Sequence, residues 1–115
     1  MADVSAMTPT EQEFHQERIV GCAMMTKQHK YNPAYFRQIL HEHGAVWAVR
    51  RLLQAENYQS GLTTLWEMGR LDYSSESAVL DPRWTSLFTE AEKAVARKRL
   101  KAINYEPTFG ISVRP

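Results

Sequence analysis

The stretch "TEAEKAVARKRLKAI", residues 89–103, carries two features that together predict an α-helix. Thr89 and Glu92 have the spacing of a capping box, in which each side chain accepts a hydrogen bond from the backbone N–H of the other residue. Apolar residues follow at the spacing of one helix face, namely Val95, Ala96, Leu100 and Ile103. The segment is therefore predicted to form a helix that packs along one side against the rest of the chain.

Start signals of the same kind recur along the sequence. Thr8 precedes Pro9 at the first helical position and Glu11 at the capping-box position, which predicts a helix to about residues 27–30. Further caps are expected at Asn32, at either Ser74 or Ser75, and at Asp81. The predicted helices span residues 9–30, 33–43, 45–54, 61–68, 75–80 and 89–103, with one more helical turn at 82–88.

The first of these helices is expected to bury one broad face. Phe14, Cys22 and Met25 recur at helical spacing, with Gly21 among them. Further apolar residues are predicted to widen the same face, namely Ile19, Val20, Ala23 and Met24.

The agreement between caps and apolar stripes predicts an all-α fold. We expect a compact single-domain bundle of five or six helices, several of them short. No run of alternating apolar and polar residues indicates a sheet. The domain is predicted over residues 8–104, with a disordered tail at residues 1–7 and an extended or disordered tail at residues 105–115.

The composition is typical of a folded domain without a strong net charge. The chain has 115 residues, of which 43% are hydrophobic and 23% charged, and its formal net charge is +1. Cys22 is the single cysteine, so no internal disulfide can form and a reducing compartment is expected. The first twelve residues lack a signal-peptide pattern, and no segment approaches the ~18 apolar residues of a membrane span. We therefore expect a cytoplasmic location and no membrane partner.

The sequence predicts no metal, cofactor or catalytic residues. His15, Cys22 and His29 are spaced by seven residues and fall on one helix face, but seven residues rise roughly 10.5 Å. One zinc ion holds its ligands within about 2.0–2.3 Å, so it cannot bind all three side chains. Cys22 lies in an apolar stretch, where a thiol is inert. No motif of a nucleophile, phosphate loop or zinc protease occurs.

DNA binding is the alternative function that the sequence leaves open. Residues 45–54 and 61–68 have the outline of a helix-turn-helix, and the helix around residues 93–101 is basic. Its candidate basic surface comprises Lys93, Arg97, Lys98, Arg99 and Lys101. Against this, the connection between the two helices is longer than the usual turn. The helix that would read the bases also has no Arg, Asn or Gln before Arg70, although base readout relies on those side chains.

Binding of a protein partner is the function that we favour. The chain is rich in large aromatics for its size, namely Trp47, Trp66, Trp84, Tyr58, Tyr73 and Phe109. We expect most of them to be buried. Any aromatic left at the surface is a natural anchor for an interface. The expected role is that of a regulatory, inhibitory or defence-associated accessory protein, whose partner and oligomeric state the sequence does not identify.

Residues 61–100, "GLTTLWEMGRLDYSSESAVLDPRWTSLFTEAEKAVARKRL", resemble a small bacterial family of uncharacterised helical proteins. The shared pattern is "TTLWE-x-GRLD", then "E-x-x-VL-x-P", "LFT-x-x-E" and "AR-x-RL". Upstream, "YFRQILHEHGAVWAVRRLL" is similar to the same family, so the likeness extends over about residues 31–104. The resemblance implies a helical fold and an origin in a bacterium or a phage, and it implies no activity.

The motif "TTLWEMGRLD" also has a direct physical interpretation. Leu65, Trp66 and Leu71 are expected to be buried, and Gly69 is expected to end the helix in the left-handed conformation. The candidate interaction site or structural corner that follows comprises Glu67, Arg70, Asp72 and Glu76. We predict that Arg70 pairs with one of the three carboxylates and fixes the turn between two helices.

Overall fold

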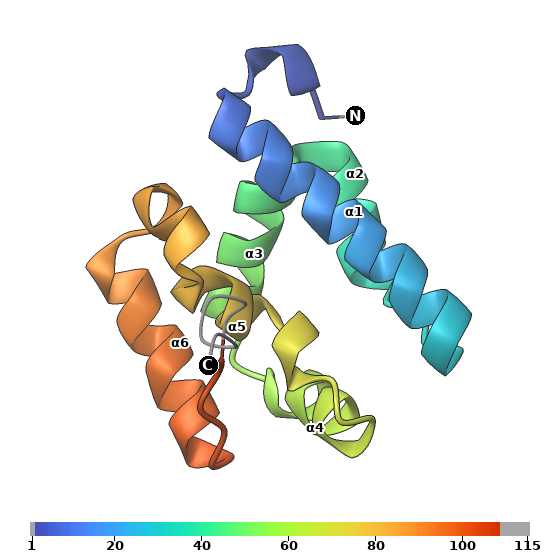
Figure 1. Cartoon of the computed structure of the whole chain (residues 1–115), viewed down its shortest axis with the longest axis vertical. Helices are drawn as coiled ribbons and strands as arrows, with labels where there is room; N and C mark the ends of the chain where they lie inside the picture. Colours follow the sequence, from blue (N-terminus) through green and yellow to red (C-terminus); the bar gives the residue numbers. More distant parts are fainter. Residues whose placement is uncertain (1, 109–115) are drawn as a thin grey trace, which may run out of the picture. The chain divides into compact units, whose positions relative to one another are not determined.

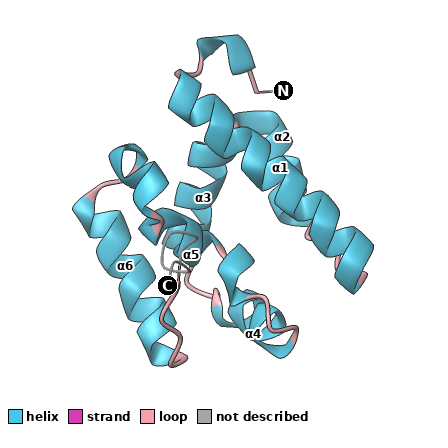
Figure 2. Ribbon diagram, in the orientation of Figure 1, coloured by secondary structure: helices cyan, strands magenta, loops and turns pink. Residues whose placement is uncertain are grey.

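The computed structural model describes residues 2–108, and all regular secondary structure in this part of the chain is helical (Figure 1). The α-helices are α1 (Pro9–His29), α2 (Ala34–His43), α3 (Ala45–Gln54), α4 (Gln59–Glu67), α5 (Ser75–Leu80) and α6 (Glu90–Ala102). There are also three short 3-10 segments in this part of the chain: η1 (Val4–Ala6) precedes α1, η2 (Leu71–Tyr73) joins α4 to α5, and η3 (Pro82–Leu87) joins α5 to α6. Figure 2 shows helix and loop alone over these residues, so the all-α prediction is confirmed.

Both predicted capping boxes are present. The Glu11 N–H donates to Thr8 Oγ1 at 3.2 Å, and the Thr8 N–H donates to Glu11 Oε1 at 2.8 Å. Thr89 and Glu92 make the same reciprocal pair at the start of α6, at 2.8 and 3.1 Å. Asp81 caps η3 as predicted, and of the two serines that could cap α5 it is Ser74 that does so. Local cap chemistry therefore decides where four of the helical segments begin.

The start of α2 differs from the prediction. Asn32 is not its cap, because α2 begins at Ala34 and Pro33 occupies the cap position without a side-chain hydrogen bond. The Ala34 N–H donates to the Asn32 carbonyl at 2.8 Å, which closes a tight turn and leaves Asn32 outside the first helical turn. The Asn32 amide oxygen accepts a hydrogen bond from Arg37 Nη1 at 3.1 Å instead.

The contacts divide the chain between Leu52 and Leu53 into two compact units. Unit 1 holds α1, α2 and the larger part of α3, and α1 packs against α2. Its most deeply buried apolar side chains are Phe14, Met25, Ile39, Leu40, Ala45, Ala48 and Val49. The extent of the predicted single domain, residues 8–104, stays a prediction.

Unit 2 is built around α5 and α6, which share the most extensive helix contact in this part of the chain. The segments η2 and η3 flank α5, and α4 packs against η2. Leu62, Leu71 and Leu100 form the centre of one apolar cluster. Half-buried side chains pack around them, namely Tyr58, Leu65, Leu80, Ile103 and Tyr105.

Two apolar stripes are narrower than the sequence predicted. In α1, the buried face is centred on Phe14, Cys22 and Met25. The side chains of Ile19, Val20 and Ala23 lie away from this face and are exposed. In α6, Val95 is exposed, whereas Ala96 and Leu100 are fully buried.

The two predicted tails contain some described structure. Residues 4–6 form η1, and the Ala2 N–H donates to the His41 carbonyl at 2.7 Å. At the other end, the Tyr105 N–H donates to the Leu100 carbonyl at 2.9 Å, and the Tyr105 ring is half-buried. The remainder of the predicted C-terminal tail, residues 109–115, including Phe109, lies outside the described residues.

Candidate interaction sites

The corner after α4 is formed by a left-handed glycine, as the motif predicts. Gly69 has φ +70°, and the Arg70 N–H reaches back to the Leu65 carbonyl at 2.8 Å. This pattern ends α4 and satisfies a carbonyl of its last turn. The start of α4, at Gln59, is two residues earlier than predicted, because the Tyr58 carbonyl already accepts the first helical hydrogen bond, from Leu62, at 3.3 Å.

Arg70 pairs with Asp72, one of the three carboxylates expected to be its partner. Arg70 Nε donates to Asp72 Oδ1 at 3.0 Å and Nη2 donates to Oδ2 at 2.9 Å, which is a bidentate pair. The guanidinium also lies over the Tyr73 ring, 4.1 Å from its centroid. The hydrogen bonds to Asp72 raise the pKa of Arg70 further. The bidentate bonds hold the two side chains together at the corner. Both side chains are partly exposed, so the pair also remains accessible at the surface.

Glu76 does not belong to this surface. It is buried and pairs with Arg99 Nη1 at 2.9 Å. Arg99 Nη2 donates to the carbonyls of Leu53 and Ala55 at 2.7 and 2.8 Å, and its guanidinium lies 4.0 Å from the centroid of the Tyr58 ring. Arg99 is 7% exposed. The prediction that Arg99 contributes to a basic surface is therefore wrong, because its guanidinium makes its hydrogen bonds inside unit 2.

The rest of the predicted basic surface is partly neutralised within α6. Lys93 Nζ is bonded to Thr85 and to Glu90, and its side chain is largely covered. Arg97 Nη2 lies 3.9 Å from Glu90 Oε1 and remains exposed. Lys98 and Lys101 are exposed as well. Arg97, Lys98 and Lys101 are therefore the cations of this helix that a polyanion could reach.

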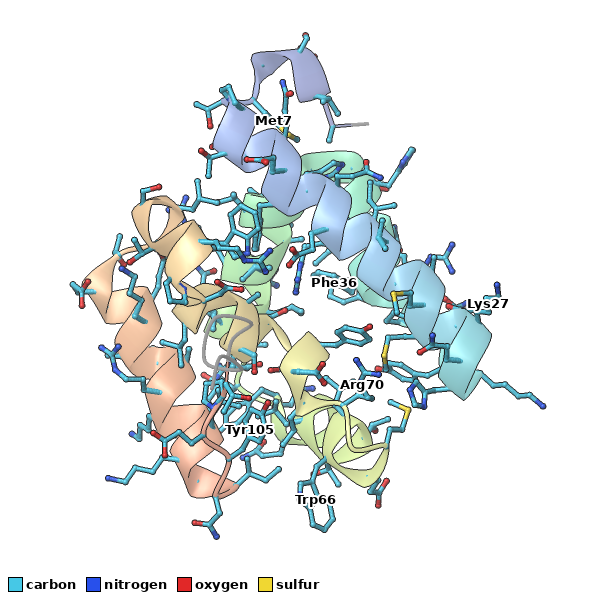
Figure 3. All side chains as sticks on the ribbon, in the orientation of Figure 1. Met7, Lys27, Phe36, Trp66, Arg70 and Tyr105 are labelled. Atoms are coloured by element: carbon cyan, nitrogen blue, oxygen red, sulfur yellow. The ribbon has the colours of Figure 1, made fainter. Side chains whose placement is uncertain are left out.

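Trp66 is exposed, contrary to the prediction that it is buried. It exposes 56% of its surface, whereas Leu65 is half-buried and Leu71 is buried. The inward face of α4 is centred on Leu62 and Leu65, and successive helix residues are rotated by about 100°, so Trp66 points away from it. Figure 3 shows the indole projecting outward from α4.

Large aromatics are more exposed overall than expected. Trp84 is buried, but Trp47 is 44% exposed, and Tyr58 and Tyr73 are only half-buried. The chain thus keeps two tryptophans at its surface, on α3 and on α4. The sequence could not separate them from core residues, because a tryptophan at helical spacing suits either environment.

A small hollow lies in unit 1, at the turn between α2 and α3. It has a volume of about 260 Å³, and His43, Trp47, Glu11 and Arg50 contribute to its lining. The His43 and Trp47 rings are stacked, with centroids 3.9 Å apart. This volume is below the roughly 300–1,000 Å³ typical of small-molecule sites. An aromatic pair at positions i and i+4, on either side of Gly44, is the only signal in the sequence that points to this place.

His15 and Cys22 of α1 are buried in unit 1. The Ala45 N–H, at the start of α3, donates to His15 Nδ1 at 3.1 Å. Burial, and to a smaller extent the nearby His41, lowers the pKa of His15. Burial raises the pKa of the Cys22 thiol. Among residues 2–108, no three histidine, cysteine, aspartate or glutamate side chains are grouped so that they could hold a metal ion.

None of the helices in the described part of the chain is both long enough and apolar enough to cross a bilayer. Comparisons of the sequence with models of protein families and with curated proteins, and of the structure with solved structures, found no match.

Proposed function

We propose that this chain is a non-catalytic protein-interaction module, a regulatory, inhibitory or defence-associated accessory protein of bacterial or phage origin. Its contact surface is the corner patch, which we define as Trp66, Glu67, Arg70, Asp72 and Tyr73. The observation that carries the proposal is the exposed indole of Trp66 at the end of α4.

The corner patch has the composition of an interface centre with its rim. Tryptophan, tyrosine and arginine are the residue types that dominate binding energy at interfaces. Here Trp66 stands outward, while Arg70 is held by Asp72 and by the Tyr73 ring. Since the guanidinium is fixed before binding, a partner has less side-chain entropy to remove when it contacts this patch.

The experiment places a photoreactive phenylalanine at position 66 in cells of the source organism. Position 35 is the matched control, because Tyr35 is a similarly exposed aromatic, at 54%, on another helix. We expect one cross-linked protein from position 66 and none from position 35. The purified partner should then lose about 30-fold in affinity on Trp66→Ala, the ~2 kcal/mol of a hot-spot residue. Equal cross-linking at both positions, or unchanged affinity, would contradict the proposal.

The alternative is a DNA-binding regulator, and the exposed Arg97, Lys98 and Lys101 on α6 are the observation in its favour. A duplex-binding titration at low and moderate salt separates the two functions. We expect no binding at low salt. Binding that weakens steeply with salt, and that disappears when the three cations are replaced by alanine, would favour the DNA function instead.

A further inference from the structure

The helix α1 carries apolar side chains on two opposite faces. Phe14, Cys22 and Met25 are buried on one face. On the opposite face, Ile19 is 41% exposed, Val20 is 46% exposed, and Ala23 is exposed beside them. A helix that packs only against its own domain has one apolar stripe and one polar face. The second apolar face is therefore not explained by the packing of unit 1.

The exposed face has the spacing of a helix-pairing seam. Its helical residues are Glu13, Gln16, Val20, Ala23 and Lys27, all of them exposed, and the exposed Lys30 follows as the C-cap of α1. The intervals alternate between three and four residues, which is the repeat that keeps a line of side chains facing a second helix. Lys27, at the far end of the line, extends away from α1 in Figure 3.

The charges along this seam are separated into an acidic end and a basic end. Glu13 lies near the N-terminus of α1, Lys27 lies in its last turn, and Lys30 is the C-cap residue that follows the helix. A parallel pair of α1 helices would place like charges together. An antiparallel pair places Val20 opposite Ala23 of the second copy, and it brings Glu13 to the end of the second copy where Lys27 and Lys30 lie, with each contact made twice.

We propose that the exposed face of α1 is covered by α1 of a second copy of this chain, in an antiparallel pair. The two-fold axis passes between Val20 and Ala23, so the interface is isologous and the contacts are self-complementary. Ile19 lies at the edge of the apolar centre. Because this centre contains only three side chains from each copy, the dimer is weak and depends on protein concentration.

Sedimentation equilibrium of the full chain over a range of concentrations tests the pairing. We expect a reversible dimer for the native chain and a dissociation constant raised about tenfold or more by Val20→Glu, which places two carboxylates at the centre. Val20 is exposed, so its substitution leaves the fold in place, and circular dichroism checks this. A monomer at every concentration, or a dimer unaffected by Val20→Glu, would overturn the proposal.

A charge-reversal cycle tests the antiparallel orientation. Glu13→Lys alone and Lys27→Glu/Lys30→Glu together should each raise the dissociation constant, and the combined triple variant should restore it. Glu56→Lys is the matched control, because it makes the same charge change at an exposed site in unit 2. Failure of the triple variant to recover the dimer would overturn the antiparallel arrangement, as would an equal effect of Glu56→Lys.

Discussion

Each unit has a buried polar link between residues far apart in the sequence, and the two links differ in kind. In unit 1, His15 accepts one hydrogen bond from the backbone of Ala45 and has to be neutral to do so. In unit 2, Arg99 pairs with the Glu76 carboxylate and also donates to the carbonyls of Leu53 and Ala55. One link is a single neutral hydrogen bond, and the other is a charged network.

This difference predicts that the two units respond to different perturbations. A neutral imidazole can no longer accept a hydrogen bond once that nitrogen is protonated. The His15–Ala45 link, and with it the stability of unit 1, is therefore sensitive to acid. A buried ion pair is most sensitive to removal of one partner, because the other charge then stays buried without compensation. Single substitutions and a change of pH therefore test whether the two units differ in this way.

The largest effect is expected from Arg99→Ala. This change leaves the Glu76 carboxylate and two backbone carbonyls in the interior without their donor, which should cost about 3–5 kcal/mol in the free energy of unfolding. Urea denaturation followed by circular dichroism measures it. Arg97→Ala is the matched control on the exposed side of α6 and should change stability by less than about 0.5 kcal/mol.

A double substitution shows whether the uncompensated charge of Glu76 causes the loss of stability in Arg99→Ala. Arg99→Met together with Glu76→Leu removes both ions and should recover part of the stability lost in Arg99→Ala. If the double variant is less stable than the single variant, the network contributes through its hydrogen bonds rather than through charge compensation.

The second-largest effect is the loss of stability expected when His15, in unit 1, is protonated at acid pH. Burial lowers the pKa of His15 below its ordinary value of 6.5, so the unfolded chain binds a proton at a higher pH than the folded chain. The stabilising contribution is therefore fully present above pH 6.5 and is lost as the pH falls toward the pKa of the folded state. Protonation removes the acceptor for the Ala45 N–H, which should cost about 1–3 kcal/mol. Denaturation midpoints at pH 7.5 and 5.5 measure the loss.

His15→Gln is the control for this pH dependence. Its side-chain oxygen can accept the Ala45 N–H and does not titrate in this range. The other charged groups on the surrounding elements are unchanged in this variant, namely Glu11 and Arg18 on α1, His41 on α2 and Arg50 on α3. An acid loss of the same size in His15→Gln would show that another group is responsible.

Both buried links also explain what the sequence could and could not predict. Caps such as Thr8–Glu11 and Thr89–Glu92 act within three residues, so their pattern is visible in the sequence and the helices that they begin were located correctly. His15 and Ala45 are 30 residues apart, and Arg99 is 46 residues from Leu53. No local pattern encodes such pairs, because they depend on how the helices pack.

The same reasoning applies to the candidate site. Arg70 and Asp72 are two residues apart, and their pairing was anticipated among three possible carboxylates. Glu76 and Arg99 are 23 residues apart, and their pairing could not be predicted. The sequence predicted Glu76 at the corner and Arg99 on a basic surface, whereas both are buried. Exposure of Trp66 depends on which face of α4 meets Leu71 and Leu100, which is a tertiary property.

A third, smaller effect is expected from Arg70→Ala. The Arg70–Asp72 pair is bidentate but partly exposed, so its loss should cost about 0.5–1 kcal/mol, well below that of Arg99→Ala. The melting temperature should fall by roughly 3–5 °C. Arg70→Lys keeps the charge but loses the bidentate geometry and should show most of the loss. An unchanged melting curve together with lost partner binding would assign Arg70 to recognition rather than to the corner.

The smallest effect is a gain in stability, and it compares the two units directly. Gly21 in α1 and Gly61 in α4 are helical glycines at which an added Cβ meets nothing within 4 Å. Alanine removes backbone freedom from the unfolded chain, so Gly21→Ala, in a helix interior, should stabilise by about 0.5 kcal/mol. Gly61 lies in the first turn of α4, where the gain should be smaller. Gly69→Ala is the opposite control, because φ +70° strains any Cβ, and it should lower the melting temperature. A loss of stability in Gly21→Ala, measured in dilute solution where the chain is monomeric, would contradict the open space around this residue.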